Sequence, residues 1–221
     1  MKKIQLLKIQ FPEINLKTRD AHKLRGYFGQ MFKEHSALLH NHYASGELRY
    51  RYPLVQYKVL GGVPTLVALE EATELLTDLF LKIKTLEIGG RRFDVHHKSM
   101  KSEQMQIGYS AELYRYRFST LWMALNQDNY KKYLQSDAES KPKMLNKIII
   151  GNVLSFFKGV KWHLDEASRL HAKVDIFEKN TQFKEREMVA FEGSFYINAC
   201  LPDGIGLGKA VSRGFGTIEK I

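Results

Sequence analysis

The alternation of apolar and polar residues divides the first hundred residues into strands and helices. Apolar residues nearly alternate from Lys3 to Phe11, which predicts a strand, and recur every three or four residues from Ala21 to Glu34, which predicts a helix. A polar loop with several histidines follows. The order of the predicted elements is βαββαβ, the ferredoxin-like arrangement that RNA-recognition modules also use. The further boundaries are a loop over His35 to Gly46, a strand over Arg49 to Val59, a tight turn at Gly61-Gly62, a strand over Val63 to Leu69, a helix over Glu70 to Ile83, and strands over Leu86 to Val95 that turn at Gly89-Gly90.

The second half of the chain repeats this order less completely. After Cys200 there is little room for a second helix, so the second domain is degenerate. We therefore predict an α+β protein of two tandem ferredoxin-like (RRM-like) βαββαβ domains, residues 1–100 and 104–221, joined near Met100 to Glu103. Its predicted elements are a strand over Gln104 to Phe118, a helix over Ser140 to Phe157, strands over Arg169 to Phe177 and Glu187 to Ala199 with a polar turn at Lys179 to Lys184, and a final strand over Phe215 to Ile221.

Composition narrows the class of partner. The 221 residues are 44% hydrophobic and 26% charged, which is typical of a folded protein, and the formal net charge of +10 favours a polyanionic partner. No stretch approaches the roughly 18 apolar residues of a membrane span, and polar residues interrupt the segment after Lys2-Lys3, so we expect neither a membrane anchor nor a signal peptide. The single cysteine excludes an internal disulfide. We expect a cytoplasmic nucleic-acid-binding protein.

A glycine-rich segment near the C-terminus, residues 204–216, is the first candidate site; we call it the glycine loop. Glycine permits a left-handed backbone and close approach to another surface, and exposed backbone N–H groups there could meet phosphates. A dinucleotide site or P-loop needs a helix directly after the glycines, and only five residues remain after Gly216. A purely structural glycine-rich connector remains an alternative. The candidate RNA-binding residues in the loop are Gly206, Gly208, Lys209, Arg213, Gly214 and Gly216.

A histidine segment after the first predicted helix is the second candidate site. On an extended backbone His40 and His42 project to the same face. Imidazoles with a pKa near 6.5 suit both general-base and general-acid roles at neutral pH. The alternatives are histidines that contact phosphates without proton transfer, or a metal site shared with His96 and His97. Adjacent histidines on a strand point to opposite faces and no Asp-rich or Cys-rich set completes a shell, so we expect no metal and no cofactor.

Basic residues interleave with aromatic ones in two predicted strands. Arg49 and Arg51 alternate with tyrosines, and the same pattern runs through 114–118. Such strands usually bury one face, so we expect most rings in the core and the arginines as candidate RNA contacts. Lys23 and Arg25 on the first helix are further candidates. Additional lysines that either extend a basic surface or are singly solvated are Lys141, Lys143, Lys147, Lys158 and Lys161.

The glycine loop carries a family resemblance. Gly206-Leu207-Gly208, five residues, then Gly214-Phe215-Gly216 resembles the G-h-G-x5-G-h-G loop of the RAMP superfamily. With the tandem domains and the histidine loop, the chain resembles the CRISPR-associated pre-crRNA processing endoribonucleases, closest to the short subgroup with a His-x-His segment. The resemblance implies metal-independent cleavage of CRISPR repeat RNA by attack of the 2′-hydroxyl, which leaves a 2′,3′-cyclic phosphate.

The same resemblance assigns roles to residues and leaves alternatives. His40 and His42 would be general base and general acid in either order, and Tyr43 and Lys58 are candidates to assist them. The implied partners are repeat RNA and subunits of an effector complex, with the protein a monomer or a homodimer. A non-catalytic RNA-binding RAMP subunit of such a complex is the main alternative, and an unrelated ferredoxin-like metal-binding or ligand-binding protein is a weaker one.

Overall fold

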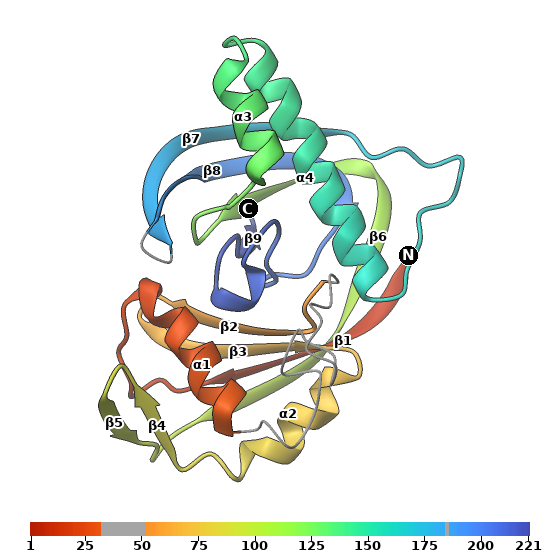
Figure 1. Ribbon diagram of the computed structural model, residues 1–221. Coiled ribbons are helices and arrows are strands. Elements are labelled where there is room, and N and C mark those ends of the chain that lie inside the picture. The colour runs from red at the N-terminus through yellow and green to blue at the C-terminus, as the bar shows by residue number, and fades with distance from the viewer. Residues whose placement is uncertain (32–51, 184–185) are drawn as a thin grey trace, which may run out of the picture. The chain divides into compact units, whose positions relative to one another are not determined.

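The computed structural model describes residues 1–31, 52–183 and 186–221, which form two compact units (Figure 1). The N-terminal unit contains residues 3–105 together with 212–214, and the C-terminal unit contains residues 1–2, 106–211 and 215–221. Strand β6 (Ser99–Phe118) continues from one unit into the other, so the chain has no separate linker at the expected junction of 100–103. No helix within the described ranges is long and apolar enough to cross a membrane.

The sheet of the N-terminal unit has the strand order β2–β3–β1–β6, the order of a ferredoxin-like fold. It contains β1 (Lys2–Gln10), β2 (Val55–Leu60) and β3 (Val63–Leu69) beside the first part of β6. Strands β2 and β3 pair antiparallel across the predicted turn at Gly61-Gly62, where both glycines have positive φ. The predicted βαββ order is confirmed.

The two helices of this unit pack on one face of the sheet. The helices are α1 (Ala21–Met31), which follows the 3₁₀ turn η1 (Thr18–Asp20), and α2 (Ala72–Phe80). Phe28 of α1 stacks on Tyr57 of β2 with ring centroids 5.8 Å apart, and on Phe11 at 6.4 Å. Because neighbours along a strand point to opposite faces, Lys58 lies on the other face, in register with Thr65.

The predicted last strand of the first domain is wrong in its placement. Strands β4 (Thr85–Ile88) and β5 (Arg91–Asp94) turn at Gly89-Gly90 as expected, but they form a separate two-stranded sheet. The place next to β1 is taken by β6, where Gln5 Nε2 donates to Ser102 Oγ at 2.6 Å. The hairpin buries Leu86 and Ile88, and the Tyr27 hydroxyl of α1 donates to the carbonyl of Thr85 at 2.8 Å.

Two further predicted boundaries of this unit are wrong for local reasons. The structure places Tyr52 to Leu54 outside β2, because Pro53 has no backbone N–H for hydrogen bonding between strands. Helix α2 begins at Ala72, since Glu70 has a φ of 50° that an α-helix does not accept.

The C-terminal unit is an antiparallel sheet of β6, β8 (Arg186–Cys200) and β7 (Ala172–Phe183), with β9 (Ile218–Lys220) paired to β6. The β7–β8 register continues from Ala172↔Ile197 to Phe183↔Arg186. The predicted turn at Lys179 to Lys184 is therefore wrong over 179–183. Polar composition misled the prediction, because Lys179 and Asn180 are exposed residues of a strand, where Lys179 pairs with Glu192 at 3.0 Å.

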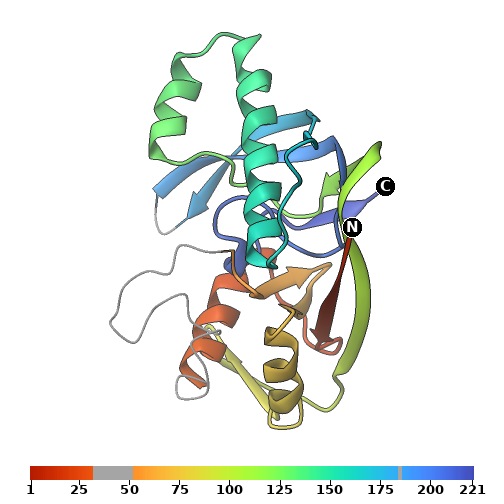
Figure 2. The same cartoon turned by 90° about the vertical axis from the view of Figure 1, so that its right-hand side faces the viewer.

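Two helices cover this unit's sheet, α3 (Gln127–Gln135) and α4 (Ser140–Gly159), and Figure 2 shows them running in opposite directions beside it. The sequence predicted α4 but not α3, which is polar and buries only Tyr133. Asn126 caps α3, its Oδ1 accepting from the backbone N–H of Asn129 at 2.7 Å. The residues of α4 that enter the core are Leu145, Ile149, Val153, Phe156 and Phe157.

Candidate functional site

The predicted catalytic segment lies outside the described residues. This applies to His40, His42 and Tyr43 and to the candidate RNA contacts Arg49 and Arg51. The described chain on either side consists of α1, which ends at Met31, and the residues that lead into β2. The geometry of the site is therefore built from α1, β2 and the glycine loop.

The glycine loop is held to the C-terminal unit by its own backbone. Leu207 donates its N–H to the carbonyl of Gly216, and Gly216 donates to the carbonyl of Leu121, both at 2.9 Å. Lys209 donates its N–H to the carbonyl of Met123, also at 2.9 Å, while its side chain is exposed. The N–H groups of Gly216 and Lys209 are thus engaged within the protein. Lys209 can meet a phosphate with its ammonium group and not with its backbone N–H.

Close packing explains why glycine stands at three of the loop positions. A Cβ on Gly216 would lie 1.9 Å from the carbonyl oxygen of Leu207, and one on Gly208 would lie 2.7 Å from Trp122 Nε1; both glycines have positive φ. A Cβ on Gly206 would lie 2.7 Å from a methyl carbon of Val211. These glycines therefore have a structural role, as expected for a glycine-rich connector. They shape the loop that carries Lys209 and Arg213.

The tip of the loop, Ser212 to Gly214, belongs to the N-terminal unit. Gly214 lies against α1 and β2, because a Cβ there would come within 2.8 Å of Ala21 Cβ and 3.1 Å of the carbonyl oxygen of Tyr57. This contact brings Arg213 near Arg25 of α1. Burial, and then the Arg25 charge, lower the pKa of Arg213. Two half-buried guanidinium groups of like charge create a positive potential that an anion would relieve.

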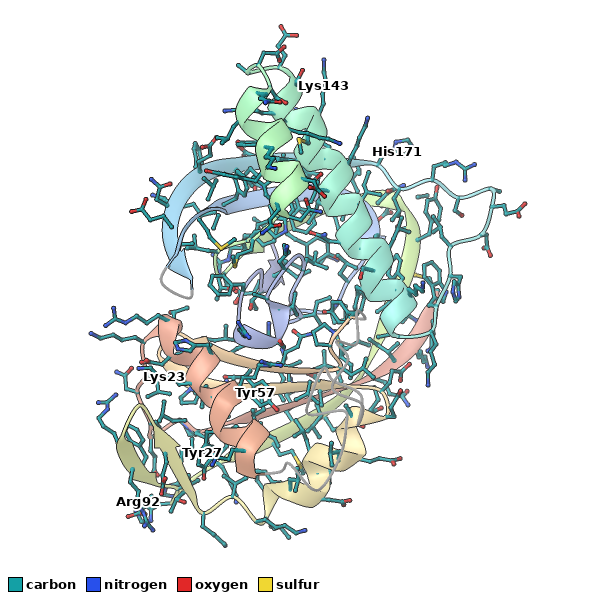
Figure 3. The ribbon with its side chains drawn as sticks, viewed as in Figure 1. Lys23, Tyr27, Tyr57, Arg92, Lys143 and His171 are labelled. Atoms are coloured by element: carbon teal, nitrogen blue, oxygen red, sulfur yellow. The ribbon has the colours of Figure 1, made fainter. Side chains whose placement is uncertain are left out.

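Lys23, the other predicted contact on α1, has an internal partner. Its Nζ lies 2.7 Å from Asp20 Oδ1, and Figure 3 shows its position on α1. Burial of Asp20 acts to raise its pKa, but hydrogen bonds from Lys23 and from the N–H of Lys17 outweigh it and the pKa is lowered. Of the two predicted cations on α1, Arg25 is therefore the better candidate for RNA.

Lys58 is fully buried on the polar face of the N-terminal sheet. Burial, and then the charge of Lys8, lower the pKa of Lys58 to about 7. Gln56 and Thr65 are buried on the same face. The alternation in the sequence placed Lys58 on the other face of the strand from Tyr57. It did not reveal that the polar side chains on this face are buried. A lysine with a pKa near neutrality can exchange a proton at physiological pH.

The arginines of β6 are engaged by neighbouring side chains. Arg115 stacks on the Tyr196 ring at 5.3 Å and donates to Ser194 Oγ at 3.2 Å, while Arg117 pairs with Glu219 at 2.9 Å. The aromatic residues between them lie inward as predicted, with Tyr116 fully buried and Phe118 nearly so. These partners make the β6 arginines weaker candidates for phosphate contact than Arg25.

His97, one of the two adjacent histidines at 96 and 97, contacts a carboxylate. His97 Nδ1 is hydrogen-bonded to Glu13, which also accepts the backbone N–H of His97 at 3.1 Å. In residues 1–31, 52–183 and 186–221, no group of three or more His, Cys, Asp or Glu side chains is placed to hold a metal ion.

Comparison with known proteins covers the whole chain. Residues 2–106 match the Cas6b N-terminal domain family and residues 108–221 match the Cas6b C-terminal domain family. Among solved structures, one described as the crystal structure of Cas6b superposes with a TM-score of 0.93 at 32% identity, and one of a CRISPR RNA processing endoribonuclease Cas6b with 0.81 at 29%. Each pair is covered over 100% of both chains. An uncharacterized protein of Methanocaldococcus jannaschii is 30% identical over 145 residues, which is 65% of this chain and 97% of that protein.

Substitution of Gly216 tests the packing role of the glycine loop. Gly216→Ala places a methyl group against the Leu207 carbonyl at a left-handed φ, and we expect it to lower the free energy of unfolding by more than about 2 kcal/mol. The matched control is Gly26→Ala in α1, where a Cβ meets nothing within 4 Å and helix propensity predicts a gain of up to about 1 kcal/mol. Urea unfolding measures both, and equal stabilities would contradict the packing role.

Substitution of Lys58 tests its lowered pKa. The unfolded chain holds the proton up to the ordinary lysine pKa, whereas folded Lys58 loses it near pH 7, so this residue makes stability rise with pH between the two values. The slope for one proton is up to about 1.4 kcal/mol per pH unit. We expect Lys58→Met to remove this component from the free energy of unfolding measured between those pH values. Exposed Lys3→Met is the control, and identical pH profiles for wild type and Lys58→Met would contradict the shift.

Proposed function

This chain belongs to the Cas6b family, and on that premise we propose that it is an endoribonuclease that cuts CRISPR repeat RNA once in each repeat, converting the precursor to crRNA. The observation that carries the proposal is the full-length similarity, at 29% identity, to a CRISPR RNA processing endoribonuclease. Repeat RNA is then the partner and the cytoplasm the compartment. The net charge of +10 supports a polyanionic substrate.

The chemistry that fits this chain is an internal transfer that needs no metal. One imidazole of His40 and His42 removes the proton of the 2′-hydroxyl, and the 2′-oxygen attacks the adjacent phosphorus. The bond from phosphorus to the 5′-oxygen breaks, and the other imidazole protonates that oxygen. The products are a 2′,3′-cyclic phosphate and a 5′-hydroxyl. Tyr43 and Lys58 remain candidates to assist, the latter supported by its near-neutral pKa.

Arg25 and Arg213 are the described residues best suited to bind the substrate backbone. Their guanidinium groups come from α1 and from the loop tip, and Gly214 packs on Ala21 between these elements. Arginine presents several donors to a phosphate and keeps its charge at any physiological pH. Binding here would favour a phosphate and would stabilise charge that develops in the transition state.

A second function uses the same arginines without cleavage. An RNA-binding RAMP subunit of an effector complex needs the loop tip and the positive charge but no proton transfer. Replacement of the histidines distinguishes the two functions, since a subunit that only binds RNA would keep its RNA affinity when His40 and His42 are replaced.

Cleavage of labelled repeat RNA by histidine variants tests the enzymatic proposal. In a chelator and at saturating protein, we expect His40→Ala and His42→Ala each to slow cleavage by about a hundredfold or more, the usual contribution of one acid or base. RNA affinity should change less than twofold. His171→Ala, which removes an exposed imidazole labelled in Figure 3, is the control and should cut normally. Full activity in the variant that combines His40→Ala with His42→Ala would remove the histidine assignment, and activity that returns only with added metal would contradict metal independence.

Replacement of the arginine pair tests the phosphate contact. Arg25→Gln with Arg213→Gln removes two proposed phosphate contacts, so the slope of log affinity against log salt should fall by about 1.4 on single-stranded RNA. The control is the double variant Arg91→Gln and Arg92→Gln, which removes the same charge from exposed positions on β5. Fluorescence anisotropy at a series of salt concentrations gives the slopes. Equal slopes for the two double variants would exclude a specific contact by Arg25 and Arg213.

A further inference from the structure

Helix α4 carries a concentration of positive charge that the proposed cleavage site does not use. Its twenty residues include lysines at four positions and no aspartate or glutamate. Lys141 is tied to the neighbouring elements, since its Nζ lies 4.7 Å from the centre of the Tyr133 ring and 3.8 Å from Glu178 Oε1. The other three lysines are exposed, and they are Lys143, Lys147 and Lys158.

Helical geometry places these three lysines in one line. At 100° per residue, Lys143, Lys147 and Lys158 fall within an arc of about 60°, and the line is about 22 Å long. We call this surface the α4 lysine face. The core residues of the helix occupy the opposite side, so the face points to solvent. Figure 3 shows Lys143 extending away from the outer end of the helix.

The helix is fixed firmly enough to hold these charges in place. Asn146 Oδ1 accepts the backbone N–H of Val174 in β7 at 2.8 Å, and Asn152 Oδ1 accepts from Trp122 Nε1 at 3.0 Å. Its five core residues fasten the same side to the sheet. The lysines therefore stand on an anchored helix, which lowers the entropic cost of presenting them together.

The middle of the α4 lysine face carries small or uncharged side chains. Gly151 lies beside the lysine line, and a Cβ there would meet no atom within 4 Å. Leu154, 41% exposed, is the large apolar side chain on the line. An extended polyanion can approach the helix here without a steric barrier, whereas one leucine offers little of the apolar area that anchors a protein partner.

We propose that the α4 lysine face binds the phosphodiester backbone of RNA outside the cleaved linkage, as a second contact that is independent of sequence. Charge complementarity supports this occupant, since three ammonium groups in a line about 22 Å long match a charged strand rather than a single phosphate. Lysine acts as a mobile point charge, which suits backbone contact and not the recognition of bases. The proposal rests on the proposed function for its RNA substrate.

Salt dependence with RNAs of two lengths tests the proposal. The variant carries Lys143→Gln, Lys147→Gln and Lys158→Gln. On a precursor with flanking sequence, its slope of log affinity against log salt should be about 2 lower than that of wild type. On a minimal repeat the two slopes should agree, and cleavage of the saturated minimal repeat should keep its rate. The control variant carries Lys3→Gln, Lys82→Gln and Lys84→Gln, which removes three exposed charges elsewhere and should leave all slopes unchanged.

Two outcomes would overturn the α4 proposal. A slope that falls equally in the two triple variants would show general electrostatic attraction, and a slope that stays unchanged in the α4 variant would leave the face to an acidic protein partner. Failure of the proposed function gives a different result, because wild type would then bind the precursor without cutting it. The slopes of affinity against salt would still decide whether α4 contacts RNA. Circular dichroism of both variants confirms that surface substitution has not unfolded the helix.

Discussion

The close fit between Gly216 and the carbonyl of Leu207 is the constraint on which the candidate site depends. Only a residue without a Cβ fits there, and the same short backbone approach allows Gly216 to donate to Leu121 while Leu207 donates back to Gly216. These bonds fix both arms of the glycine loop. Its tip, Ser212 to Gly214, belongs to the N-terminal unit, where Gly214 packs against Ala21. Within that unit, the packing of Gly214 against α1 and β2 accompanies the position of Arg213 near Arg25.

The basic residues that the structure describes differ in their surroundings. The arginines of β6 and Lys23 have acidic or aromatic neighbours, so their charges are largely satisfied within the fold. Arg25 and Arg213 instead lie near each other, and the exposed lysines of α4 stand on a helix without a single acid. Replacing Lys23 or a β6 arginine costs these internal pairs. A count of basic residues along the sequence does not make this distinction.

The ferredoxin-like frame also explains where sequence patterns failed. The last strand of the first domain was assigned to a hairpin with a good turn, yet that hairpin pairs with itself and β6 takes the position beside β1. Local periodicity identifies strands but not their partners, because pairing depends on residues far apart in the chain. Helix α3 was missed because its composition is polar. Polar residues at 179–182 continue β7, because a strand at the edge of a sheet can expose its side chains to solvent.

Sequence patterns alone were enough to predict the α+β class, the first four elements of the N-terminal domain, the main helix α4 and the family to which the glycine loop points. These follow from periodicity, turn chemistry and a spaced glycine motif, all of which are local in the chain. The sequence also named His40, His42 and Tyr43, which lie outside the described residues and stay predictions. The folded structure was needed to show that the loop glycines serve packing, that burial lowers the pKa of Lys58 to about 7, and that Lys23 and the β6 arginines have partners within the fold. These properties depend on burial and on distances between side chains that only the folded chain brings together.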